Sequence, residues 1–82
     1  MNKYSVSYYH NATGYGWKEE TNRLEDFESF IDEMRADHNA NITVWDNTIN
    51  KFIYWQQGCF YKVDLLSDIL RDMRTKTKEV KR

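Results

Sequence analysis

Residues 24–35, LEDFESFIDEMR, constrain the fold more than any other stretch of this chain. Their apolar members recur every three or four positions, which is the spacing of one side of an α-helix: Leu24, Phe27, Phe30, Ile31 and Met34. Acidic residues fill most of the other positions: Glu25, Asp26, Glu28, Asp32 and Glu33. The pattern predicts an amphipathic helix that runs to about Asp37, with one face in a core and the other strongly acidic.

The same apolar pattern returns 39 positions later, between Val63 and Arg74. Its apolar face consists of Val63, Leu66, Ile69, Leu70 and Met73. We therefore expect a second helix that begins near Lys62 or Val63 and packs on the same core. Two interpretations of the likeness stay open: two ββα repeats within the chain, or two amphipathic helices that simply share one period.

Alternating side chains predict four strands. Lys3–Tyr9, Tyr15–Thr21, Asn41–Trp45 and Lys51–Gln57 are rich in β-branched and aromatic residues. In the last strand, Phe52 and Tyr54 should face away from Ile53 and Trp55. Asn22 and Glu25 fit a capping box at the start of the first helix. The sequence thus predicts an α+β fold of order ββαββα, in which a four-stranded, mostly antiparallel sheet carries both helices on one face.

The composition predicts one small domain with a basic tail. The chain has 82 residues, and we expect residues 1–76 to form the domain and residues 77–82 to fray. Residues 1–70 hold six Lys/Arg and eleven Asp/Glu, a charge of −5, whereas residues 71–82 hold six and two, a charge of +4. The N-terminal residues lack the apolar core of a signal peptide, and one cysteine fits a reducing compartment. These features favour a cytoplasmic protein that does not span a membrane.

No arrangement of residues predicts catalysis. Cys59, His10 and His38 fall in expected loops, and nothing in their spacing brings them together. Cys59, beside Phe60, is expected to be a small buried side chain. The histidines and the cysteine lack the spacing of a metal site, and no glycine-rich loop precedes a helix. We expect no metal, no cofactor and no enzymatic activity.

Two features suggest binding instead. The acidic side of the first helix, with Glu25, Glu28, Asp32 and Glu33, is either an ordinary solvated face or a surface that meets a basic partner. The chain is also 16% aromatic, and one covered sheet face cannot take every large ring. Trp17, Trp45 and Trp55 are the first candidates for rings on the open face, where Trp suits a protein interface.

In these features the chain resembles small phage-encoded inhibitors of bacterial defence, of the anti-CRISPR and anti-restriction kind. The resemblance lies in size, in the acidic helix LEDFESFIDEMRAD and in the aromatic strands ITVWD and KFIYWQQ. It implies a non-enzymatic protein that binds and blocks a host protein that handles nucleic acid, through a basic surface on that host protein. The basic tail departs from a fully acidic mimic of DNA.

Two other functions stay open. A nucleic-acid-binding protein could use the aromatic sheet face and the basic tail, although the charge of the body opposes phosphate binding. A homodimer could hold a small ligand at its interface.

Overall fold

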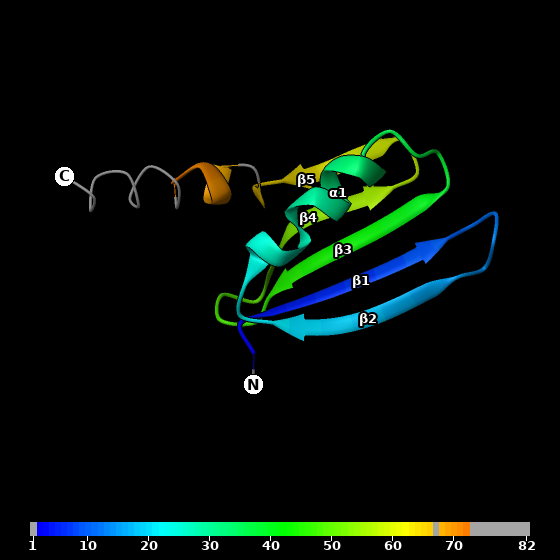
Figure 1. The fold of residues 1–82 in the computed structure, drawn as a ribbon. Coiled ribbons are helices and arrows are strands. Elements are labelled where there is room, and N and C mark those ends of the chain that lie inside the picture. The colour runs from blue at the N-terminus through cyan, green and yellow to red at the C-terminus, as the bar shows by residue number, and fades with distance from the viewer. Residues whose placement is uncertain (1, 67, 73–82) are drawn as a thin grey trace.

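The structure is a computed structural model that describes residues 2–66 and 68–72, except for the side chains of residues 61 and 62. Its five strands are β1 (Tyr4–His10), β2 (Gly16–Thr21), β3 (Ala40–Asp46), β4 (Lys51–Gln57) and β5 (Phe60–Asp64). They form one antiparallel sheet in the order β2-β1-β3-β4-β5 (Figure 1). The predicted α+β class and antiparallel sheet are confirmed, and the predicted count of four strands is wrong.

The fifth strand replaces the expected start of the second helix. Gly58 and Cys59 form a two-residue turn, after which Phe60 pairs with Gln57 and Val63 pairs with Trp55. Gly58 has a φ of 61°, a value that glycine adopts without steric cost. The predicted order ββαββα and the two ββα repeats therefore fail in the second half, where three strands precede the helical residues 66 and 68–72.

A 3₁₀ turn opens the first helical segment. This turn, η1 (Leu24–Phe27), leads into α1 (Glu28–Met34), and together they connect β2 to β3. The predicted capping box is absent, because no side chain caps η1 and the Asn22 side chain instead accepts a hydrogen bond from the backbone N–H of Lys3 at 2.7 Å. The apolar stripe is confirmed: Leu24 and Ile31 are buried, and Phe27, Phe30 and Met34 pack against the core.

The core lies between the helical segments and one face of the sheet. Its central strands contribute alternate residues, namely Tyr4, Val6 and Tyr8 from β1 and Ala40, Ile42 and Val44 from β3. Leu66 and Leu70 join the same core, with Ile69 packed against it, as the sequence predicts. Val63 lies in β5 instead of a helix, and Met73 and the predicted tail 77–82 lie outside the described residues.

A bulge changes the faces of β4. Val44 pairs with Tyr54 and Trp45 pairs with Phe52, so Ile53 is an extra residue in this strand. As a result, Ile53 and Tyr54 are both buried although they are consecutive, and Phe52 shares the outer face with Trp45. The prediction that Phe52 and Tyr54 share a face is therefore wrong. Among the described helices, none is long and apolar enough to cross a membrane.

Candidate functional site

The face of the sheet opposite α1 carries an aromatic strip, which consists of Trp45, Phe52, Trp55 and Phe60. These residues lie on the three adjacent strands β3, β4 and β5. The Trp45 and Phe52 rings meet edge to face, with centroids 4.7 Å apart and planes at 83°. Phe52 is 42% exposed and Phe60 is 73% exposed. Exposed aromatic rings held on a rigid sheet provide contact area with little loss of conformational entropy on binding.

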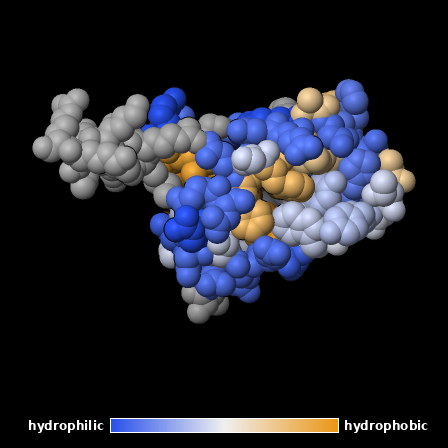
Figure 2. Space-filling view, viewed as in Figure 1, coloured by the Kyte–Doolittle hydropathy of each residue, from blue (hydrophilic) through white to orange (hydrophobic). Residues whose placement is uncertain are grey.

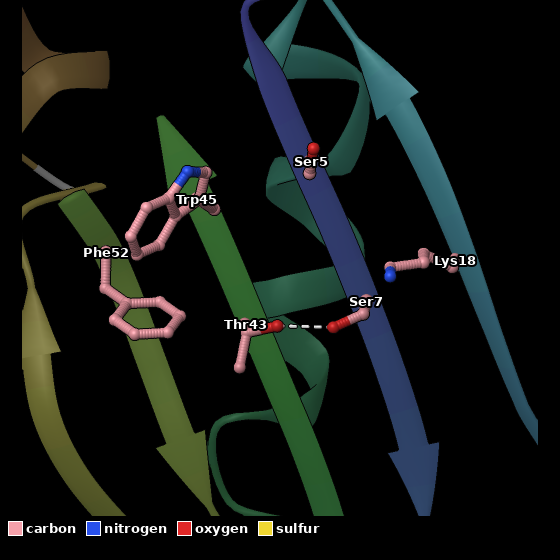
Figure 3. A pocket seen from close by; sticks show the side chains of 6 residues that line it. All are labelled: Ser5, Ser7, Lys18, Thr43, Trp45 and Phe52. Atoms are coloured by element: carbon pink, nitrogen blue, oxygen red, sulfur yellow. Dashed lines mark hydrogen bonds between the residues drawn. The ribbon is translucent and has the colours of Figure 1, made fainter. Parts of the chain in front are cut away.

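Hydroxyl groups and a lysine from β1, β2 and β3 border this strip. Ser7 and Thr43, which face each other across β1 and β3, share a side-chain hydrogen bond. Lys18 pairs with Ser7 from the other side. An open pocket is lined by these residues together with the Trp45–Phe52 corner, and its members are Ser5, Ser7, Lys18, Thr43, Trp45 and Phe52 (Figure 3). The surface therefore combines a flat apolar area with hydrogen-bonding groups at its border.

The strands contribute little charge to this open face. Among the described strand residues whose register places them there, Lys18 and Glu20 are the charged ones. Glu20 pairs with Ser5 and lines a second pocket with Ser5, Lys18 and Glu19. The described open face is thus close to neutral, whereas a surface for nucleic acid needs several cations to replace the counterions of the phosphates.

The acidic side chains lie on the other side of the molecule. Glu25 lies on η1, and Glu28, Asp32 and Glu33 lie on α1, which Figure 3 shows behind the sheet. Figure 2 shows this α1 side as mostly hydrophilic with a hydrophobic patch near its centre. Arg23 and Arg35 neutralise part of the charge, since each Nε lies 3.3 Å from an aspartate oxygen, on Asp26 and on Asp32 respectively.

Arg35 also joins α1 to β5. Its Nη1 lies 2.5 Å from Oδ2 of Asp64, and its guanidinium carbon lies 5.2 Å from the ring centroid of Tyr54. The hydrogen bond to Asp64 raises the pKa of Arg35, although partial burial opposes the shift. Asp32 therefore belongs to a structural ion-pair group as well as to the acidic surface.

The structure separates Trp17 from the other two tryptophans proposed for binding. Trp17 pairs with Tyr8 across β1 and β2, on the face that the helices cover. Its ring centroid lies 5.9 Å from that of Phe27 and 5.3 Å from that of Phe30. Half-buried Trp17 thus packs at the border of the core, while Trp45 and Trp55 share the open face.

The sequence-based expectations for Cys59 and His38 are wrong. Cys59 is exposed, not buried, and its Sγ is in hydrogen-bond contact with Nδ1 of His38. His10 lies elsewhere, with Nε2 3.1 Å from Oδ2 of Asp37. Spacing along the chain could not reveal the Cys–His contact, because it depends on how the β4–β5 turn meets the loop before β3. In the described part of the chain, no group of three or more His, Cys, Asp or Glu could hold a metal ion.

Comparison with known proteins adds no relative: no protein-family model, curated protein or solved structure matches the chain.

Proposed function

We propose that this chain is a non-enzymatic protein-binding module that contacts its partner through the aromatic strip. The observation that carries the proposal is the edge-to-face pair of Trp45 and Phe52 on the sheet face opposite α1. Trp and other aromatic residues dominate the binding energy of many protein interfaces when a rim of polar groups surrounds them. Ser7, Thr43 and Lys18 supply such a rim here.

The near-neutral charge of the described open face favours a protein over a nucleic acid as the partner of this surface. Stacked bases would bring phosphates next to Lys18, with Glu20 close by on the same strand. A protein surface with an apolar patch needs no such neutralisation. Protein binding is therefore the function that we assign to the strip, and nucleic-acid binding is an outcome that the experiment below can detect.

The acidic surface of η1 and α1 is a second surface that a partner could contact. The two surfaces lie on opposite sides of the sheet, so one flat partner surface cannot cover both. A partner that wraps around the molecule, or two partners, would use both. An inhibitor of a host protein that handles nucleic acid fits this proposal, because a basic surface of that protein would meet Glu25 and Glu33.

Affinity capture with strip variants tests the proposal. The double variant Trp45→Thr/Phe52→Thr removes the ring pair and places Thr, a β-branched residue that favours strands, at both positions. The wild-type chain should capture a specific protein from a bacterial lysate, and the purified partner should bind the double variant at least about tenfold more weakly. Tyr15→Thr is the matched control, because Tyr15 is a 62% exposed aromatic residue outside the strip.

Equal binding by the wild type and the double variant would contradict the proposal. Recovery of nucleic acid that disappears as salt rises would favour nucleic-acid binding instead. Loss of self-association in the double variant, measured by sedimentation, would assign the strip to a homodimer. Circular dichroism of each variant shows whether the fold is retained.

A further inference from the structure

Two loops bring a thiol and an imidazole together at one end of the sheet. Cys59 follows Gly58 in the turn between β4 and β5, and His38 lies between α1 and β3. Both side chains belong to exposed residues, and Sγ of Cys59 contacts Nδ1 of His38. A cysteine beside a histidine is the arrangement that activates a thiol, because the imidazole can take the thiol proton.

The backbone holds these two loops in place. The Gly58 N–H donates to the carbonyl of Ala40 at 2.9 Å, which ties the turn to the start of β3. The approach is so close that a Cβ on Gly58 would lie 2.7 Å from the carbonyl oxygen of His38. The β4–β5 turn therefore cannot move away from the start of β3 without breaking the hydrogen bond between Gly58 and Ala40, and a residue with a Cβ would not fit at position 58 without a shift.

The buried side chain of Gln56 reinforces the same junction. Gln56 is 1% exposed, and its Nε2 donates to the carbonyls of Met34 and Gly58 at 2.9 Å each, and of Ala40 at 3.4 Å. One amide thus connects the end of α1, the start of β3 and the turn that carries Cys59. A buried side chain thus fixes the positions of the two loops that carry Cys59 and His38.

We propose that Cys59 and His38 form a reactive pair, a site for thiol–disulfide exchange with small disulfides. Nδ1 of His38 takes the S–H proton of Cys59 while the sulfur attacks one sulfur of the disulfide. A new S–S bond forms to Cys59, the disulfide's own S–S bond breaks, and the leaving thiolate receives the proton from His38. One thiol and one disulfide give one mixed disulfide and one free thiol, so no further oxidant is needed.

The rate of reaction with 4,4′-dithiodipyridine tests this pair. Cys59 is the one cysteine in the sequence, so all thiopyridone released reports on it. The folded wild type should react roughly tenfold faster than the same chain in concentrated guanidinium chloride. His38→Gln should remove most of that difference and leave the rate of the denatured chain unchanged. Mass spectrometry after exposure to oxidised glutathione should show one glutathione added to the wild type.

Two outcomes would overturn the proposal. One is a folded wild type that reacts no faster than the denatured chain. The other is a folded His38→Gln variant that reacts as fast as the wild type. Circular dichroism shows whether His38→Gln folds, and if it does not, the comparison of folded with denatured wild type decides alone.

Discussion

Gln56 is a polar residue that the core needs. Its Oε1 accepts a hydrogen bond from the Tyr54 hydroxyl at 2.5 Å, and its Nε2 donates to the carbonyls of Met34, Ala40 and Gly58. Gln56→Leu fills the space but leaves these buried groups without their partner, and unsatisfied groups each cost about 1–3 kcal/mol. We expect the free energy of unfolding to fall by about 3 kcal/mol.

Chemical denaturation of Gln56→Leu and Gln57→Leu measures this effect. Gln57 is the exposed neighbour with the same side chain, so its replacement should change stability by less than ~0.5 kcal/mol. Similar losses for both variants would mean that the buried amide has no special part in the fold.

Asp46 makes stability depend on pH. Burial alone would raise its pKa, but hydrogen bonds from the Thr48 hydroxyl and from the N–H groups of Thr48 and Ile49 outweigh burial and lower it. A carboxylate with a lowered folded-state pKa stabilises the fold above its ordinary value of about 3.9, and this contribution is lost as pH falls through the folded pKa.

The variant Asp46→Asn tests this assignment. It should be less stable than the wild type at neutral pH, and the gap should narrow as pH falls below about 4. Urea denaturation across this range measures the gap. A gap that stays constant with pH would show that the charge of Asp46 does not contribute. The pKa of Asp37 is also lowered, chiefly by the hydrogen bond from the N–H of Asn39, so both the wild type and Asp46→Asn should lose some stability in acid.

At the scale of elements, Leu65 and Leu66 are neighbours with opposite environments. Leu66 is 1% exposed within the core, and Leu65 is 49% exposed. Leu66→Ala should cost about 2–5 kcal/mol, because a cavity forms where the helical residues meet the sheet. Leu65→Ala is the control and should cost less than about 1 kcal/mol. Thermal and denaturant unfolding compare the stabilities of the two variants. Equal losses of stability would contradict the assignment of Leu66 to the core-facing side.

Periodicity predicted most of the elements and failed where one residue changes the pattern. The sequence predicts the first hairpin, the helical stripe and the β3–β4 pair because each repeats over several residues. The fifth strand is not predicted because a glycine after a strand pattern usually indicates its end, although a Gly-X pair between β-formers, here Gly58 and Cys59, also predicts a two-residue turn. The extra residue Ile53 reverses the alternation in β4, and nothing in the local sequence marks it.

The candidate site was predicted only in part for a similar reason. Aromatic content predicts rings on an open face, and Trp45 and Trp55 are found there. Trp17 is placed correctly only when it is known that its side of β2 faces the helices. The contact between Cys59 and His38 depends on how two loops meet, and these residues are 21 positions apart in the chain. Contacts of this kind depend on tertiary structure, which residue spacing does not encode.

At the scale of the whole molecule, the sheet separates two surfaces of different chemistry. The aromatic strip covers one side, and the acidic residues of η1 and α1 cover the other. An apolar contact resists salt, whereas attraction between charged surfaces is screened over about 10 Å at 0.1 M salt. Association measured at low and high salt therefore distinguishes the two surfaces.

The double variant Glu25→Lys/Glu33→Lys tests the acidic surface with the fold intact. Both glutamates are exposed, and the ion pair of Glu25 with Arg23 is long, with 3.9 Å between Oε1 and Nε, so its loss should cost little stability. Asp32 belongs to the Arg35 ion-pair group and is better left unchanged. If the partner meets this surface through basic residues, reversal places like charges opposite each other, and the association rate should fall by about tenfold or more at low salt. The wild-type rate should also fall as salt rises. Stopped-flow or surface-based kinetics against the captured partner measure both rates.

Equal association rates for the wild type and the double variant, unaffected by salt, would remove the acidic surface from the mechanism. The aromatic strip would then be the contact, because its ring pair acts mainly on the rate of dissociation.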